Sequence, residues 1–424
     1  MKNKLFLSLF VVGLISTSLV GCGNNEDNDP SVTPDTINLR FWNGFTGKDG
    51  DAMRSIVNEF NKEYKGVIKV KSDSVVWDNL FLKLIQNKGD AEHSPHIAVI
   101  PANRISLVRT KGVIKPINSL VDYLGITRDE YIDAAWEIGL VDDVRWSFPL
   151  DMHPTLLYYN KDLIDESELP TTWEEFETVI KAKTQNRVYG WAIPSMYSIT
   201  LDVFMNMLIQ KDSDLFEVQD GQYVPVFNSQ KCIDILTLLQ KWKYTDKVSP
   251  TSVGAAGDLT LFNSGKSVFY FDGIYQMNAL YETSPINWGA TNMPGTMVMG
   301  GKGYSGSHQW TLVESTTQDD KIQNACYTFI KYVNEHAVNW AKGGQVPACK
   351  SVHEEDEFKA IQPVVTAKNQ ALVSTMGTMK YDYYYEAYNF VGSAVANTLG
   401  NNTDPKVALD NAYAQFQQFL KENQ

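Results

Sequence analysis

Short apolar runs and helical patterns alternate along the body of the chain. Residues 37–42 are a compact β-like run, and a glycine-punctuated loop follows over residues 43–50. The next apolar residues recur at helical spacing: Met53, Ile56, Val57 and Phe60. Residues 67–70 and 96–100 then predict strands, and residues 77–85 predict a helix between them. This alternation with short loops predicts βαβ units and a largely parallel sheet.

Two later helices carry start signals. The run Thr172-Trp173-Glu174-Glu175 after Pro170 is a capping box, and it predicts a helix through Lys183. Asp404-Pro405 predicts the start of a last amphipathic helix. One side of that helix is expected to be apolar: Val407, Ala408, Ala412, Phe416 and Leu420.

The first 22 residues combine two lysines, an apolar run over residues 5–20 and a cysteine. A secretory signal has this layout, and the run is short for a stable membrane span. Its end, Leu19-Val20-Gly21-Cys22, resembles the lipobox of a bacterial lipoprotein signal. The resemblance implies that residues 1–21 are a signal peptide and that Cys22 carries a lipid after cleavage. The alternative is an ordinary signal peptide that happens to contain a cysteine.

The segment after the signal is polar. Residues 23–36 contain two prolines and predict a flexible tether, so the lipidated Cys22 and its tether span residues 22–36. No later segment approaches about 18 consecutive apolar residues, so we expect no further membrane span. About 390 residues remain. This length exceeds what one core usually supports and predicts two lobes.

Charge and cysteine content exclude several classes of partner. The net charge is −13, and removal of the two signal lysines makes it −15. Such a charge argues against binding to nucleic acid or to an anionic membrane face. Three cysteines remain after Cys22, namely Cys232, Cys326 and Cys349. Without CxxC spacing they predict buried free thiols rather than a structural zinc site, with a Cys326–Cys349 bridge as the alternative.

Several sequence blocks occur in a fixed order along the mature chain. They are residues 41–44 ahead of 56–61, residues 148–151 leading into 157–163, and then 170–175, 262–266, 271–275, 306–308 and 343–348. In this order, behind a lipobox, the blocks closely resemble family 1 extracellular solute-binding proteins. These are the sugar-binding lipoproteins of ABC importers and relatives of maltose-binding protein.

The resemblance implies an α/β, two-lobed periplasmic-binding-protein-like fold of type II. Each lobe would be a mainly parallel sheet flanked by helices, and crossing hinge segments would join the lobes. The N-terminal lobe would comprise residues 37–148 plus 294–342, and the C-terminal lobe residues 149–293 plus 343–424. Function would be hinge closure around a solute in the cleft, followed by presentation to a membrane permease.

A sugar site needs flat aromatic rings for the C–H faces of the ligand and short polar groups for its hydroxyl rim. The aromatic candidates and the amide beside them are Trp42, Asn43, Phe45, Trp77, Trp191, Tyr197 and Tyr275. We expect Trp42, Asn43 and Phe45 to leave the first strand, and Trp191 to lie on a loop. Core packing is the alternative for these rings. Tyr275 stands where relatives often carry tryptophan after Gly-Pro.

The polar candidates follow the same logic. They are Asp151, His153, Asp272, Ser305, Ser307 and His308. A carboxylate can accept two sugar hydroxyl bonds, and glycines around the serines allow a close backbone approach. His153 has a purely structural alternative, as a hydrogen-bonding group in the hinge. Asp382 with Tyr383 and Tyr384 forms a further cluster, for which packing is again the alternative.

Arginine usage favours a neutral ligand. The chain has seven arginines, and none follows Arg187. Phosphate and carboxylate ligands usually require bidentate arginine, although lysine can substitute. A neutral carbohydrate is therefore favoured over glycerol phosphates or uronates.

The sequence predicts a substrate-binding lipoprotein of an ABC importer, not an enzyme, that captures a mono- or oligosaccharide. The expected partners are the carbohydrate, the permease and its ATPase, with a lipid anchor on the outer face of the cytoplasmic membrane. We expect a monomer, with no catalytic residues, cofactor or metal. One alternative is the same fold binding a glycerol phosphate or a peptide. Others are an exported glycoside hydrolase with two carboxylates, or a surface adhesin.

Overall fold

The computed structural model describes residues 35–196 and 198–423. The predicted signal peptide 1–21, the predicted lipidation site Cys22, nearly all of the predicted tether and the candidate Tyr197 lie outside these residues. Within them, no helix combines the length and the apolar character needed to cross a membrane.

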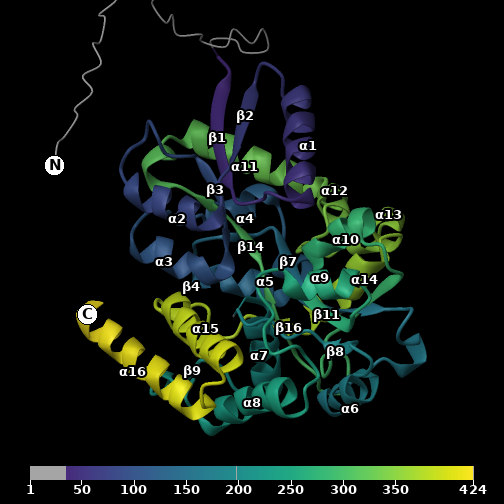
Figure 1. Ribbon diagram of the computed structural model, residues 1–424. Coiled ribbons are helices and arrows are strands. Elements are labelled where there is room, and N and C mark those ends of the chain that lie inside the picture. The colour runs from purple at the N-terminus through teal and green to yellow at the C-terminus, as the bar shows by residue number, and fades with distance from the viewer. Residues whose placement is uncertain (1–34, 197, 424) are drawn as a thin grey trace, which may run out of the picture.

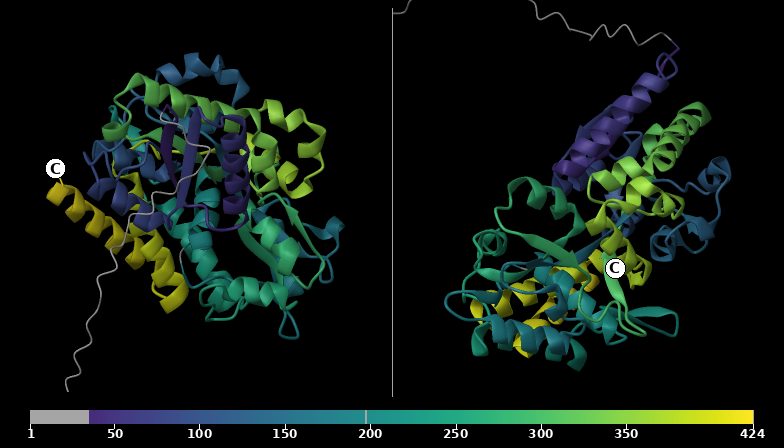
Figure 2. Two further views of the ribbon diagram at one scale, coloured as in Figure 1. Left: turned by 90° about the horizontal axis from the view of Figure 1, so that it is seen from above. Right: turned by 90° about the vertical axis from the view of Figure 1, so that its right-hand side faces the viewer.

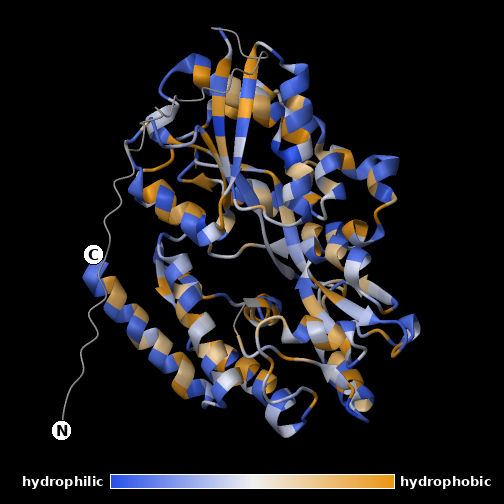
Figure 3. Cartoon of the chain, turned by 45° about the horizontal axis from the view of Figure 1, so that its top comes forward, coloured by the Kyte–Doolittle hydropathy of each residue, from blue (hydrophilic) through white to orange (hydrophobic). Residues whose placement is uncertain are grey.

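A five-stranded sheet forms one end of the molecule, in the order β2-β1-β3-β14-β6 (Figure 1). Its three parallel strands are β1 (Ile37–Asn43), β2 (Ile68–Ser74), which lies at the edge, and β3 (Ile97–Pro101). The other two, β14 (His308–Leu312) and β6 (Phe148–Pro149), return from later in the chain and run antiparallel to their neighbours. Figure 3 shows hydrophobic and hydrophilic residues alternating along β1 and β2.

Helices cover this sheet as the apolar spacing predicts. In α1 (Lys48–Glu63), all four predicted core residues are buried. α1 packs against β2, and α11 (Asp320–Glu335) packs against β1, far from it in sequence. α2 (Trp77–Gln86) begins at the predicted residue and ends one residue later than predicted. It packs beside α3 (Ile105–Thr110).

A seven-stranded sheet forms the other half, in the order β16-β13-β7-β11-β8, with β12 and β15 also paired to β7. Its strands are β7 (Asp151–Asn160), β8 (Tyr189–Trp191), β11 (Ser267–Gly273), β12 (Trp288–Thr291), β13 (Gly303–Gly306), β15 (Val346–Pro347) and β16 (Ser374–Thr375). The two-lobed α/β fold agrees with expectation. The predicted mainly parallel character does not hold for this sheet, because the long β7 receives β11, β12, β13 and β15 antiparallel.

The helices of this half lie at the opposite end of the molecule from β1 and α1 (Figures 1 and 2). They include α6 (Trp173–Lys183), α7 (Ser198–Gln210), α8 (Gln230–Gln240), α15 (Tyr384–Asn401) and α16 (Pro405–Asn423). The capping box of Thr172 is formed as predicted. In α16 the prediction fails only for Val407, which is half exposed. It stands one position, about 100° of rotation, before Ala408, which belongs to the buried stripe of the helix.

Three crossing segments connect the halves. β6 pairs in the first sheet and β7 in the second, so Leu150 alone links them. β13 pairs in the second sheet and β14 in the first, with Ser307 between them. A third segment runs from α12 (Ala337–Lys342) into β15. We therefore propose Ser307, not residues 293–294, as the return crossing; the other lobe boundaries stay predictions.

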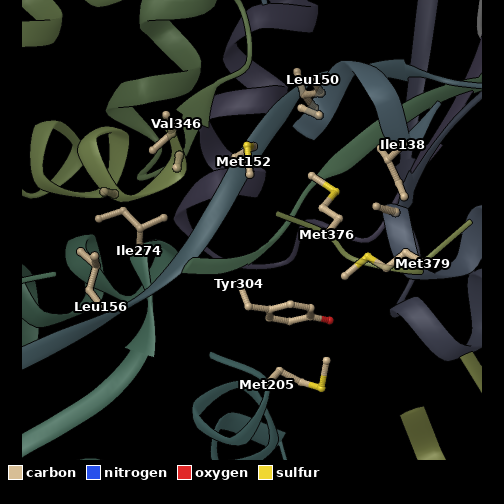
Figure 4. Close-up of a cluster of buried hydrophobic side chains, with 14 of the residues drawn as sticks. Ile138, Leu150, Met152, Leu156, Met205, Ile274, Tyr304, Val346, Met376 and Met379 are labelled. Carbon is tan, nitrogen blue, oxygen red and sulfur yellow. The ribbon is translucent and has the colours of Figure 1, made fainter. Parts of the chain in front are cut away.

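Apolar side chains fill the space where the segments cross. Around β7, Met152 and Leu156 meet Ile274, Val346 and Met376 (Figure 4), and all of these are buried. The three cysteines in the described residues are free and buried, as expected, and no Cys326–Cys349 bridge is formed. The crossing region is therefore a packed core rather than an open joint.

Candidate functional site

A cleft lies between the two sheets. Three adjoining cavities of about 220, 760 and 570 Å³ form it, and Tyr275 lines all three. Pro101 and His153 both line the first two cavities, and Asp202 lines the first and third. Pro101 ends β3 of the first sheet, whereas His153 belongs to β7 of the second. Residues from both halves therefore surround one space, the interlobe cleft.

Three rings that line the cleft lie directly over glycines. A Cβ built on Gly44 would stand 2.1 Å from the Trp77 ring, and one on Gly273 would stand 2.1 Å from the Tyr275 ring. A Cβ on Gly306 would stand 2.2 Å from the His153 ring. Any larger residue at these glycines would push the ring out of place. The glycines of the loops therefore determine where the cleft presents its aromatic faces.

A buried carboxylate joins the crossing segments. Asp151 has no exposed surface, and its oxygens accept hydrogen bonds from Trp340 Nε1 at 2.8 Å and from the His308 backbone N–H at 2.9 Å. The ring Nδ1 atoms of His308 and His153 lie 2.9 and 3.3 Å from its oxygens. Burial opposes ionisation, but the neighbouring His308 and His153 hold the pKa of Asp151 well below its usual range. Burial and the nearby His308 lower the pKa of His153.

Asp151, His153 and His308 are also close enough to bind one metal ion, since their ligand atoms lie within 4.8 Å of one another. Hydrogen bonds already occupy the carboxylate oxygens, the atoms that a cation would need. We therefore assign the group a structural role. It ties β7 and β14 to α12, which contributes Trp340.

The third cavity is rich in carboxylates. Asp202 accepts from Tyr388 Oη at 2.9 Å, and Asp272 accepts from Tyr275 Oη at 2.8 Å. Burial raises the pKa of Asp202 and of Asp258 to about 6, and burial also raises the pKa of Asp272. These groups sit among tyrosine rings, a combination that offers strong acceptors for hydroxyl groups beside apolar faces.

Few cations face the cleft. Among the described residues that line the third cavity, Arg104 is the single cationic side chain, and its guanidinium lies 3.1 Å from the ring centre of Tyr385. Lys48 lines the second cavity and is paired with Glu282 at 2.8 Å. Among the described lining residues, both cationic side chains therefore have protein partners, and the cleft carries an excess of acidic groups.

Comparison with known proteins identifies the family. The sequence pattern of one family, described as bacterial extracellular solute-binding protein, matches residues 55–363. The chain belongs to this family. The galactooligosaccharide-binding protein of Bacillus subtilis is 24% identical over 97% of this chain and 96% of its own length. The arabinooligosaccharide-binding protein of Halalkalibacterium halodurans is 23% identical over 60% of this chain and 58% of its own length.

Other matches extend the range of ligands and establish the fold. A glycerol-3-phosphate-binding periplasmic protein of Agrobacterium fabrum is 28% identical over 34% of this chain and 36% of its own length. Among solved structures, the sugar-binding protein MalE of Xanthomonas citri gives a TM-score of 0.77 at 18% identity, covering 91% of this chain and 98% of that one. A cyclo/maltodextrin-binding protein bound to maltotetraose gives 0.73 at 21%, covering 92% and 98%. At these identities the likeness establishes the fold alone.

In this solute-binding protein, many predicted site residues come together at the cleft. Those that line its cavities are Trp77, His153, Asp272, Tyr275, Ser305, Ser307 and His308. Phe45 and Asn43 stand behind them: Phe45 packs edge-on against Trp77, and the Asn43 amide bonds Ser72 Oγ at 3.0 Å. Contact of any of these residues with a ligand stays a prediction.

Four predicted residues lie elsewhere. Trp191 belongs to β8 and is buried against Phe271, so its predicted loop position is wrong; its strand pairs with β11. Trp42 is half-buried and packs against a second apolar cluster. Tyr384 is buried beside Tyr304, and Tyr383 packs against Phe419 of α16. Their packing alternative therefore accounts for both tyrosines.

The sequence reasoning missed several lining residues. Tyr385 and Tyr388 lie one turn apart on α15, and both line the third cavity. The predicted residues beside them, Tyr383 and Tyr384, do not line it. Asp202 is a lone carboxylate within an apolar helical run, which is a signal that could have revealed it. Gln345 stands in the sequence block 343–348, directly after two glycines, and that position could have revealed it. Asp258 carries no comparable signal, because only the fold brings it to the cleft.

Proposed function

We propose that this family member is the solute-binding component of an ABC importer and that it binds a neutral oligosaccharide in the interlobe cleft. One observation carries the proposal: aromatic rings seated on glycines share one cleft with buried carboxylates and few cations. Rings suit the C–H faces of sugars, and carboxylates accept pairs of hydroxyl bonds. The oligosaccharide-binding relative that aligns over nearly the whole chain supports the same ligand class.

The remaining steps of the proposal concern delivery. The lipobox-like Leu19-Val20-Gly21-Cys22 supports export and anchoring by a lipid on Cys22 to the outer face of the cytoplasmic membrane. The three crossing segments support closure of the lobes around the solute. The closed protein would deliver the solute, without chemical turnover, to the permease and its ATPase.

Glycerol phosphate is the second candidate. Several relatives that match about a third of the chain are named as glycerol-3-phosphate-binding proteins. A phosphate prefers arginine forks. Arg104 is instead stacked on Tyr385, and four carboxylates line the same cavity. The charge of the cleft therefore favours the neutral sugar.

A thermal-shift screen of residues 30–424 tests the proposal. We expect galacto- or arabino-oligosaccharides to raise the melting temperature, because a ligand at 100 times its Kd stabilises a protein by about 2.7 kcal/mol. Chromatography of the recovered sugar should show no hydrolysis. A shift with sn-glycerol 3-phosphate or peptides, and none with any oligosaccharide, would contradict the neutral-sugar assignment.

A further inference from the structure

Gln345 is a buried amide without a partner. Its exposed fraction is 0%, and neither Oε1 nor Nε2 has a hydrogen-bond partner among the described residues. Gln345 is also one of the residues that line the 760 Å³ cavity, together with Trp77 and Tyr275. Buried amides in folded proteins are almost always hydrogen-bonded, so an unmatched one that borders a cavity points to a ligand.

Another buried glutamine shows the usual arrangement. Gln370 is also 0% exposed, but its Nε2 donates to the Thr155 carbonyl at 2.7 Å and its Oε1 accepts from the Met293 N–H at 2.8 Å. Gln370 joins α14 (Gln362–Leu372) to β7 and to the segment after β12. Gln345 has the same burial without any of these bonds, so a structural role does not account for its amide.

The backbone holds Gln345 at the floor of the cleft. The preceding Gly344 has φ +90°, a conformation that favours glycine, and a Cβ there would lie 3.6 Å from Tyr275 Cα. The following Val346 pairs with Met152 of β7, beside which it lies in Figure 4. Gln345 is therefore fixed between the third crossing segment and the residues that present Tyr275.

We propose that the Gln345 amide is a subsite for two adjacent hydroxyl groups of a sugar ring, which rests on the proposed function. Nε2 donates to one hydroxyl oxygen, and Oε1 accepts the proton of its neighbour, while the ring packs near Trp77. A vicinal diol supplies both a donor and an acceptor. A carboxylate or a phosphate dianion supplies acceptors alone and leaves Oε1 unmatched. The subsite therefore fits a vicinal diol and not a bare carboxylate or phosphate group at this position.

The proposal predicts opposite effects on stability and binding. Without a ligand, the unmatched amide destabilises the protein, since its desolvation has no compensating bond. Substitution by an apolar side chain of similar shape, Gln345→Met, should leave the melting temperature of the ligand-free protein unchanged or raise it by a few degrees. The same variant should bind the oligosaccharide that stabilises the wild type at least about tenfold more weakly. A residue that serves folding alone would not give this combination.

The experiment compares wild type, Gln345→Met and Gln370→Met in the chain of residues 30–424, by thermal melting and by calorimetric titration with that oligosaccharide. Gln370→Met removes two satisfied bonds, so we expect a lower melting temperature and a Kd within about threefold of wild type. A fall in melting temperature for Gln345→Met like that of Gln370→Met, or its failure to fold, would overturn the subsite. An unchanged Kd in Gln345→Met would overturn it too. A wild type that binds no oligosaccharide would instead show that the proposed function fails, and the subsite with it.

Discussion

At the scale of single residues, the cleft depends on pairs of a ring and a glycine. Gly44 and Trp77 are far apart in sequence, yet the ring lies on the glycine backbone. Gly273 and Tyr275 form the same arrangement within a short turn, η5 (Ile274–Gln276). Because no side chain intervenes, each ring stands where the loop backbone places it.

Gly273→Ala tests this arrangement. The added Cβ would stand 2.1 Å from the Tyr275 ring, which must move; Tyr275 is 45% exposed, so the ring has room to do so. We expect oligosaccharide affinity, measured by calorimetric titration, to fall about tenfold, or ~1.4 kcal/mol, with little loss of stability. Gly254→Ala is the control, because a Cβ there meets nothing within 4 Å. Equal affinities for the two variants would contradict the role of the glycine.

Buried histidine determines part of the response to acid. His353 is 5% exposed, and its Nε2 lies 2.9 Å from the Pro347 carbonyl oxygen. Burial lowers the pKa of His353 to about 4. The unfolded chain, with a pKa near 6.5, takes up the proton first, so the stability from neutral His353 is complete above pH 6.5 and is lost as the pH falls toward 4.

We therefore expect the wild type to lose about 2 kcal/mol more unfolding free energy between pH 7 and pH 5 than His353→Gln does. Urea unfolding at both pH values measures the difference. Comparison with the variant is essential, because Asp202 and Asp258 act in the opposite direction. Their pKa is about 6 in the folded protein, so their protonation raises the unfolding free energy as the pH falls over the same range. Parallel pH profiles would argue against a buried neutral imidazole.

At the scale of elements, the start of α6 shows how local chemistry defines a helix. Thr172 Oγ1 accepts from the Glu175 N–H at 3.2 Å, and Glu175 Oε2 accepts from the Thr172 N–H at 3.2 Å. Two backbone donors that the helix cannot satisfy are thereby bonded. The buried face of the helix, Phe176 and Ile180, then packs onto the second half of the molecule.

Thr172→Ala should lower the free energy of unfolding by about 1 kcal/mol, the usual effect of losing such a cap. Thr178→Ala is the matched control, since Thr178 is exposed within the same helix and alanine is the better helix former. Urea denaturation compares the two. A loss of equal size in both variants would show that the cap contributes nothing beyond helix propensity.

At the scale of the whole molecule, contacts on either side of the crossing segments hold the halves together. Lys48 of α1 pairs with Glu282, which lies in α10 (Met277–Thr283). Arg109 of α3 pairs with Asp382, in the segment before α15. These pairs join elements of the first sheet to elements of the second, so they stabilise the arrangement in which the cleft is enclosed.

Asp382→Asn should weaken oligosaccharide binding by about two- to fivefold, because a partly exposed pair contributes up to about 1 kcal/mol to the enclosed arrangement. High salt should reduce the difference from wild type. Asp410→Asn is the control, since Asp410 pairs with Lys406 inside a single helix. Titration at low and high salt checks both expectations. If Asp382→Asn binds the oligosaccharide at low salt as tightly as the wild type does, the Arg109–Asp382 pair has no role in closure.

Much of the local structure was predictable because it depends on neighbours in sequence. Apolar spacing predicts α1, and a capping box predicts α6, since periodicity and terminal hydrogen bonds act within a few residues. Several cleft residues, such as Ser307 and His308, were predictable from a family block and the glycines around it. Strand direction in the second sheet was not predictable, because β7 pairs with strands that lie more than a hundred residues further along the chain.

By itself, the sequence determined the class of the protein, through the alternation that predicts two α/β halves and through family blocks in order; the export signal ahead of them stays a prediction. Only the tertiary structure decided which polar groups meet. Asp151 finds His308 and Trp340 at separations of 157 and 189 residues, while Gln345 finds no protein partner beside the cleft. Hydrogen bonds act over about 3 Å and have no sequence period, so no local pattern records which groups the folded chain pairs and which it leaves for a ligand.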